Sequence, residues 1–525
     1  MNSAKNISIS ENWLVRIAWL YLLIPFLIFC LGFLRIYISL PILTLFGWLS
    51  IRLWKSNQSS EKLVRPSSDW LFLGLIVLAW VFLSGVGGYA FQNTDFNGRN
   101  AIFRDLINYS WPVYYTNLGS SLMPAHTFSF VYYFGYWLAP ALIGKLLGWT
   151  AANIALFLYS VLGVGITVSL LAKRMKTSLL VSILLLVFFS GMDILGALLK
   201  QYASPGIYPT LWPPISHLEW WQTYQISSFT TQLFWVVNQA IPAWICTMLV
   251  LTRKDNHLIF LVWSLCFFFA PIPALGLALL VFAQVLNDLL QPIQNESKTS
   301  FWRAMIARLH GLFSPENILG GGLVTVLMYF FYQSNRSTGK IGLIPLDGMA
   351  IISLILFALI EWFVLWLAVA KNRRKDISWY FMGGLLAVSP MIDLAGTPII
   401  SERATIPFML LLMVWCGETL LHERSKTSVL VALLLVIGAC TPIYEMNRSG
   451  VRTAEFYRLP FVQQKVAGQC YVKQEDRIAF YDPEKDHPGE LVAEDWYSLA
   501  SLNLEYLVSY VGDTSNATFF KYLSR

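Results

Sequence analysis

The stretch AANIALFLYSVLGVGITVSLLAKR, residues 151–174, decides the fold class of this 525-residue chain. It carries no charged side chain from Ala151 to Ala172 and then ends on Lys173 and Arg174. About 20 consecutive apolar residues are enough for a helix to cross the hydrocarbon core of a bilayer. Lys and Arg collect in the cytoplasmic loops that follow such helices. The stretch therefore predicts a membrane-spanning helix whose C-terminal end faces the cytoplasm.

The composition of the whole chain extends this prediction. Hydrophobic residues make up 56% of the chain, whereas Asp, Glu, Lys and Arg together make up only 13%. The charged share of a soluble domain is about twice as large. Too few charges remain to cover a soluble protein of this size, so we expect an all-α polytopic membrane protein. Apolar runs predict 13 crossings, at residues 13–31, 36–54, 70–90, 150–171, 178–198, 231–252, 257–270, 272–290, 317–333, 348–370, 377–394, 405–421 and 427–443.

The crossings at 257–270 and 272–290 come from one long apolar run. Pro271 and Pro273 interrupt that run, and proline breaks a helix because it lacks an N–H donor. Both flanks are basic, so the chain must cross an even number of times there.

Basic clusters separate many of the apolar runs and set the expected topology. They lie at Arg52–Arg65, Lys173–Lys176, Arg253–Lys254, Lys298–Arg308, Lys371–Lys375 and Arg424–Lys426. The positive-inside rule places these loops in the cytoplasm, with the N-terminus inside and the C-terminus outside. The clusters are short and dispersed, which argues against nucleic-acid binding.

Two external loops and a tail remain outside the predicted spans. Residues 126–148 are apolar enough to cross, but a crossing there would place Lys173–Lys176 outside. We therefore expect an interfacial helix there, within one external loop at 91–149. A second external loop, 199–230, is rich in Trp and Pro. The sequence thus predicts a membrane domain at 1–444 and a small extracytoplasmic region at 445–525.

The first external loop contains the segment QNTDFNGRNAIFRDL, residues 92–106, with four charges in a chain that otherwise avoids them. Asp95 is the candidate general base for a hydroxyl group, and Asp105 is a candidate substrate ligand. Arg99 and Arg104 are candidates to hold a phosphate. The alternative is an ordinary helix cap with solvated loop charges.

Three more basic residues are expected on the same face. Arg403, in the segment ERATIP at 402–407, precedes a predicted helix whose N-terminal dipole favours an anion. Arg336 and Lys340 lie in the loop 334–347. The alternatives are an interfacial Glu402–Arg403 ion pair and, for the loop residues, anchoring to lipid headgroups.

The second external loop has its own candidates. His217, Glu219, Trp220 and Trp221 combine polar groups with flat aromatic faces, as sugar sites do, although an interfacial aromatic belt has the same composition. His217 and Glu219 would suit a metal only with a third ligand. Glu361 lies near the middle of a predicted span, where an acid is by default a functional hypothesis.

The arrangement of these segments resembles the GT-C superfamily of integral membrane glycosyltransferases, which use sugars carried on polyprenyl phosphate. Asp95 takes the place of the acidic residue that follows a span in these enzymes. Residues 130–148 are similar to the interfacial helix of the family, and Ala151–Leu171 with its basic turn is similar to the next span. The segments QNTDFNGRNAIFRDLINYSWPV and ERATIP also look like those of bacterial membrane proteins of this type. In this chain Asp95 is followed by Phe96 and not by a second acid, Trp220-Trp221 is followed by Gln222, and the two N-terminal spans are extra.

The resemblance implies a glycosyltransferase in the inner (plasma) membrane of a bacterial cell. Its donor would be a polyprenyl-phosphate sugar, and its acceptor a glycan, a lipid or a protein. Arg403, with Arg99, Arg104 or Lys340, would hold the donor phosphate while Asp95 removes the proton of the acceptor hydroxyl. The resemblance leaves undecided whether the enzyme uses a divalent metal ion as a cofactor.

Two other interpretations of the sequence are open. One is a transporter or flippase of a lipid-linked substrate, which predicts a second broken helix to match the one at Pro271–Pro273. The other is a polymerase or ligase subunit of a polysaccharide pathway.

Overall fold

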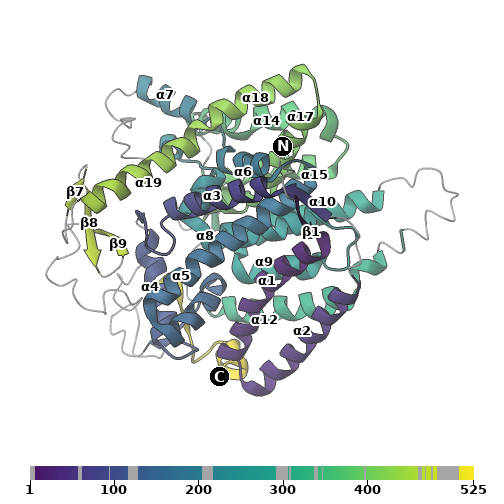
Figure 1. Ribbon diagram of the computed structural model, residues 1–525, viewed down its shortest axis with the longest axis vertical. Coiled ribbons are helices and arrows are strands. Elements are labelled where there is room, and N and C mark those ends of the chain that lie inside the picture. Colours follow the sequence, from purple (N-terminus) through teal and green to yellow (C-terminus); the bar gives the residue numbers. More distant parts are fainter. Residues whose placement is uncertain are drawn as a thin grey trace.

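The computed structural model describes most of the chain as one bundle of helices (Figure 1). It describes residues 6–56, 62–93, 95–115, 128–203, 217–290, 305–306, 309–335, 341–345, 347–394, 398–458, 464–466, 469–474, 477–481 and 508–525. Within these ranges the strands are short and lie in small two- or three-stranded sheets.

Each apolar run that the sequence predicted as a span is helical over most of its length. The main exceptions are residues 84–90, the break at 189–192, and strand β6 (Ile392–Leu394). The helices are α1 (Glu11–Phe33), α2 (Ile36–Ser56), α3 (Ser67–Leu83), α5 (Gly135–Arg174), α6 (Leu179–Phe188), α7 (Asp193–Ala203), α8 (Phe229–Thr252), α9 (Ile259–Phe269), α10 (Pro271–Leu290), α12 (Gly322–Gln333), α13 (Gly348–Ala358), α14 (Val364–Arg373), α15 (Ile377–Val388), α17 (Ile406–His422) and α18 (Lys426–Gly438). In the described part of the chain, eight helical stretches are long and apolar enough to cross a membrane. The prediction of an all-α membrane protein is confirmed at this level, and the number and direction of the crossings remain predictions.

The proline break in the long apolar run is present. Helix α9 ends at Phe269, Ala270 leaves the helical conformation with φ −152° and ψ 80°, and α10 begins at Pro271. The sharp turn lets α10 approach the start of α17 closely. A Cβ atom on Gly276 would lie only 1.7 Å from the carbonyl oxygen of Ala404.

The region predicted as an interfacial helix differs from the expectation. Residues 116–127 lie outside the described part, Phe128–Phe130 form strand β4, and the helix begins only at Gly135. The sequence missed the strand because it is short and one of its two partners is distant. Strand β4 pairs with β3 (Tyr114–Tyr115) and with β10 (Val511–Asp513) near the C-terminus.

Helix α5 is a helical hairpin and not one straight rod. Gly148 has φ 85° and ψ −179°, which reverses the chain. A Cβ atom on Gly144 would lie 2.8 Å from that of Ala152, and the hydroxyl groups of Tyr136 and Ser160 are 2.5 Å apart. The arm that begins at Gly135 therefore runs antiparallel to the start of the following helix.

The C-terminal residues return to the bundle. Helix α19 (Cys440–Arg458) continues from α18 past residue 444, and the strands β7 (Gln464–Val466), β8 (Gln469–Gln474) and β9 (Arg477–Tyr481) form a separate sheet beside its end (Figure 1). Phe519 contacts the rings of Phe29 and Phe331. The last residues of the chain thus form part of the core around α1 and α12.

Candidate functional site

The first polar cluster begins where helix α4 (Asp95–Asn108) follows α3. The side-chain oxygen of Asn93 accepts a hydrogen bond from the Asp95 N–H, at 3.1 Å. The Asn93 amide nitrogen donates to the carbonyl of Phe234 in α8, at 2.9 Å. The start of α4 is therefore tied to α8, and Asp95 stands in its first turn, where the helix dipole favours a negative charge.

Asp95 forms an ion pair with Arg99, one turn further along α4, with 2.8 Å between Oδ2 and Nη2. The Asp95 side chain is 36% exposed, whereas that of Arg99 is 11% exposed. The Nη1 atom of Arg99 is buried and has no hydrogen-bond partner among the described residues. The pair thus presents an accessible carboxylate beside a guanidinium whose hydrogen bonds are incomplete.

Arg403 is far from Asp95 in the sequence. It ends the short helix α16 (Ile399–Arg403), immediately before α17. Its Nη1 atom donates to the Tyr133 hydroxyl at 3.3 Å, and its buried Nε atom has no partner within the described part of the chain. A buried guanidinium N–H without a partner calls for an explanation, and a bound anion is one.

Asp95 and Glu402 both influence the ionisation of Arg403 electrostatically. Burial alone would lower the pKa of Arg403, but Tyr133, Glu402, Tyr132 and Asp95 together raise it. Burial raises the pKa of Glu402, Arg403 opposes this, and Asp95 raises it further. The predicted segments 92–106 and 393–407 therefore lie within range of each other's charges, and we call Asp95, Arg99, Glu402 and Arg403 the Asp95–Arg403 cluster. Sequence reasoning treated Glu402 only as an ion-pair partner and missed it as a half-buried acid with a raised pKa.

Two other candidates from the same segment have different surroundings. Arg104 is buried over the ring of Trp149 in α5, with 4.6 Å between Cζ and the ring centroid. Asp105 is 1% exposed and accepts a hydrogen bond from the Tyr115 hydroxyl at 2.5 Å. These contacts brace α4 against α5 and β3. Lys340 and Arg336 lie outside the described residues.

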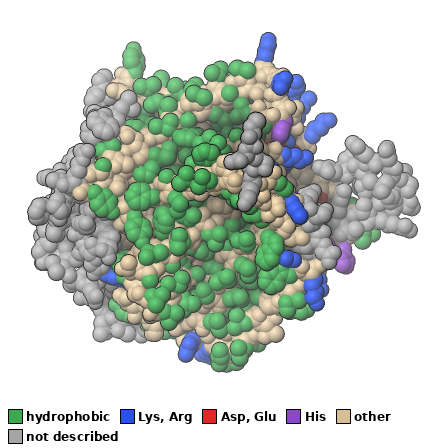
Figure 2. Space-filling model, in the orientation of Figure 1, with side chains coloured by type: hydrophobic (Ala, Val, Ile, Leu, Met, Phe, Trp, Pro, Cys, Tyr) green, Lys and Arg blue, Asp and Glu red, His purple; other side chains and the backbone are tan. Residues whose placement is uncertain are grey.

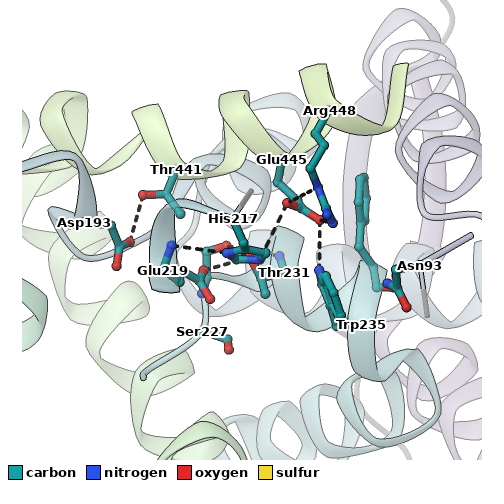
Figure 3. A network of polar contacts seen from close by, with 12 residues as sticks. Asn93, Asp193, His217, Glu219, Ser227, Thr231, Trp235, Thr441, Glu445 and Arg448 are labelled. Atoms are coloured by element: carbon teal, nitrogen blue, oxygen red, sulfur yellow. Dashed lines mark hydrogen bonds and ion pairs between the residues drawn. The ribbon is translucent and has the colours of Figure 1, made fainter. Parts of the chain in front are cut away.

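The candidates of the second loop belong to a separate, deeply buried network (Figure 3). His217 and Glu219 are each 1% exposed at the short helix η1 (Leu218–Trp221). The Glu219 carboxylate accepts hydrogen bonds from the Ser228 N–H, the Thr231 hydroxyl and the Gln225 amide, at 2.9, 2.7 and 2.8 Å. Its hydrogen-bonding capacity is well used inside the protein.

Helix α19 supplies the rest of this network, which we call the His217–Glu445 network. The Nε2 atom of His217 lies 3.6 Å from a Glu445 oxygen. Glu445 accepts from the Trp235 indole at 2.9 Å and from two nitrogens of Arg448 at 2.6 and 3.1 Å. Sequence reasoning missed Glu445 and Arg448, because it ended the last span at residue 443. Their spacing of three residues in a helical continuation was the available signal.

Burial sets the protonation of the loop residues. It lowers the pKa of His217 to about 4, with Glu445 opposing and Arg448 reinforcing the shift. It raises the pKa of Glu219 to about 8, and Asp193 adds to the rise while the hydrogen bonds from Ser228, Thr231 and Gln225 oppose it. His217 is therefore neutral at pH 7, and Glu219 is largely protonated.

Trp221 and Trp220 differ in exposure. Trp221 is buried and its indole donates to Glu361 at 3.2 Å, in the π-helical turn η3 (Leu359–Phe363) between α13 and α14. Asp193 is 1% exposed and accepts from the Thr441 hydroxyl at 2.8 Å. Trp220 is 48% exposed and stacks on His217, with ring centroids 5.3 Å apart. Trp220 is thus the aromatic surface of this network.

No group of three His, Cys, Asp or Glu side chains in the described ranges has an arrangement that could hold a metal ion. In comparisons with known proteins, no family model, no curated protein and no solved structure matches this chain. Fold and site together define an all-α protein with candidate membrane-spanning helices, a cluster of charged side chains at the start of α4, and a separate buried polar network.

Proposed function

We propose that the protein is a membrane glycosyltransferase that moves a sugar from a polyprenyl-phosphate donor to an acceptor hydroxyl, with Asp95 as the general base. One observation carries the proposal: the accessible Asp95 carboxylate forms an ion pair with Arg99 and interacts electrostatically with Arg403, and each arginine has a buried N–H group without a partner among the described residues. Phosphate oxygens are the acceptors that guanidinium groups bind most strongly.

The reaction assigns each charge a role. Asp95 takes the proton of the acceptor hydroxyl, whose oxygen attacks the anomeric carbon of the sugar. The bond from that carbon to the phosphate oxygen breaks, and polyprenyl phosphate leaves with the electron pair. Arg99 and Arg403 stabilise the negative charge on the leaving group, and such preorganised donors contribute most where charge develops.

The exposed ring of Trp220 is linked through Trp235 to the part of α8 that holds Asn93. Trp220 contacts Trp235, with ring centroids 5.7 Å apart, and Trp235 follows Phe234, whose carbonyl binds Asn93. A flat aromatic face at this position suits the apolar side of a sugar ring. We assign Trp220 to the sugar or the acceptor, and the charged cluster to the phosphate.

The test separates binding from chemistry. Polyprenyl phosphate is the leaving group of every donor in this class, so its binding can be measured before the sugar is known. The Asp95→Asn protein in lipid nanodiscs should bind it at least as tightly as the wild type, because a negative charge near the phosphate is removed. With a panel of polyprenyl-phosphate hexoses and pentoses, its release of polyprenyl phosphate should fall by about 10²–10⁴-fold.

Glu402→Gln is the matched variant, because it neutralises the other acid of the cluster. It should retain most of the transfer rate. Near-normal turnover by Asp95→Asn, or loss of turnover only in Glu402→Gln, would contradict the assignment of Asp95. Absence of polyprenyl-phosphate binding by the wild type would contradict the donor class.

A further inference from the structure

A pocket at the C-terminal ends of α5 and α8 is lined by three basic segments that are far apart in the sequence. Strand β2 (Lys62–Pro66), which pairs with β1 (Asn6–Ser10), lies beside the C-terminal ends of α5 and α8. Together they surround a pocket of about 620 Å³. In Figure 2 the Lys and Arg side chains gather along one side of the molecule, at the right of a broad hydrophobic face.

The wall of the pocket is strongly and uniformly basic. Eleven described residues line it, seven of them are Lys or Arg, and none is Asp or Glu. The basic residues are Lys62, Arg65, Lys173, Arg174, Lys176, Arg253 and Lys254. The buried side chains of Leu14 and Leu63 add an apolar part to the wall.

Contacts directed out of the pocket hold this wall in place. Arg65 donates through Nε and Nη2 to the carbonyl of Thr177, at 3.2 and 2.5 Å. Arg174 pairs with Glu418, and Arg253 pairs with Asp288, each at 2.6 Å. Neither carboxylate lines the pocket. The arginines are therefore fixed, while the side chains of Lys62 and Lys176 are exposed at the wall.

Helix dipoles explain only part of this concentration. A cation at the C-terminal end of a helix is stabilised by the dipole, which accounts for Arg174 on α5. Lys62 and Arg65 lie on a strand, where no such dipole acts. A hollow lined by one sign of charge focuses the electrostatic potential and attracts a counter-ion.

We propose that this pocket binds a phosphate-bearing anion, either the headgroup of an anionic membrane lipid or a soluble polyphosphate. Seven cationic side chains surround the hollow, two of them already paired with Glu418 and Asp288, and the remaining excess of positive charge suits an anion with several charges. Basic pockets between membrane helices on the cytoplasmic side bind anionic headgroups, and the apolar wall at Leu14 and Leu63 suits the glycerol and first acyl carbons of a lipid. The site is separate from the Asp95–Arg403 cluster and does not depend on the function proposed for it.

The experiment uses the full chain with the double variant Lys62→Gln/Lys176→Asn. Lys176 has φ 51°, a conformation that Asn tolerates well, so the backbone should be retained. Lys371→Gln/Lys375→Gln is the control, since it removes the same charge from exposed residues near Arg373, which shares Glu418 with Arg174. One arm titrates pyrophosphate into protein in nanodiscs of zwitterionic lipid only. The other arm measures, by native mass spectrometry, retention of cardiolipin from mixed micelles.

The pocket variant should lose about ten- to thirtyfold in affinity for the anion, from two cations near the site, and the control should bind as the wild type does. Loss in the pyrophosphate arm identifies a soluble ligand, and loss only in the cardiolipin arm identifies a lipid headgroup. The proposal fails if the pocket variant binds both probes normally, or if the control loses as much, because the charge would then act diffusely.

Discussion

The Asp95–Arg403 cluster and the His217–Glu445 network both contain acids, arginines and aromatic rings. They differ in how many of their polar groups have hydrogen-bond partners. Arg448 uses two nitrogens on Glu445, and Glu219 accepts three hydrogen bonds. Arg99 and Arg403 each have a buried N–H without a partner in the described structure. Buried polar groups that all have hydrogen-bond partners are typical of a structural core. Buried N–H donors without an acceptor call for an explanation, and a bound ligand is one.

The largest effect should follow from breaking the buried ion pair of the network. In Arg448→Met the carboxylate of Glu445 stays buried without its strongest partner. We expect a loss of about 3–5 kcal/mol in the free energy of unfolding. Thermal and denaturant unfolding in detergent would measure it, with Arg448→Lys as the milder control. An unchanged melting temperature of Arg448→Met would contradict the structural role of this network.

The matching change in the cluster should affect function and not stability. Arg403→Lys keeps the charge but loses the planar fork of donors. We expect polyprenyl-phosphate affinity or transfer to fall by about 10²–10³-fold, as when a preorganised donor is removed, with little change in melting temperature. If Arg403→Lys instead unfolds the protein and Arg448→Lys impairs transfer, the roles of the two regions are reversed.

Gly276→Ala should disturb the Asp95–Arg403 cluster through the contact of Gly276 with Ala404. The new Cβ atom would lie 1.7 Å from the Ala404 carbonyl oxygen, so α10 or the residues around Arg403 must move. We expect a loss of about 1–3 kcal/mol in stability, as in other overpacked sites, together with reduced polyprenyl-phosphate binding. Gly384→Ala in α15 is the control, because no atom lies within 4 Å of its added Cβ. Equal behaviour of the two variants would contradict the close packing at Gly276.

The smallest effect is a change in pH dependence. Glu219 has its pKa raised to about 8, so the folded state binds more protons than the unfolded state and stability falls as pH rises from about 4.5 to 8. His217 has its pKa lowered to about 4, which gives the opposite trend between about 4 and 6.5. Above pH 6.5 only the Glu219 contribution remains of these two. Glu219→Gln should therefore abolish a decline of about 1–2 kcal/mol between pH 6.5 and 8. Parallel melting curves for the two proteins would contradict this assignment.

Sequence reasoning succeeded for the local features of the fold. The break at Pro271 and the helical runs followed from hydropathy and from proline chemistry, which act over a few neighbouring residues. Strand β4 was not predicted, because its partner β10 lies almost at the C-terminus. The sequence prediction ended one helix at residue 148 and began the next at residue 150, and the chain turns at Gly148. What the sequence did not show is that the two arms pack against each other, with Gly144 against Ala152.

The candidate site likewise has contacts that the sequence predicts and contacts that only the structure shows. The Asp95–Arg99 pair is a one-turn helical contact, and its residues could be found from the sequence alone. Their proximity to Arg403 was expected only from the proposed chemistry, and the fold supplies it. Arg104 and Asp105 carry the same charges as Arg99 and Asp95, but their packing against Trp149 and Tyr115 gives them structural contacts. Charge type is visible in a sequence, but burial and partners are not.

By itself the sequence determined that this chain folds into apolar helices and where most of them lie, because the length and hydropathy of each run are local properties. Only the tertiary structure decided which polar groups meet. It placed Asp95 with Arg403, satisfied Glu445 with Arg448, and gathered Lys62, Lys173 and Arg253 around one pocket. The physical reason is that charged groups are few in this chain, so the function of each depends on contacts between segments far apart in the sequence.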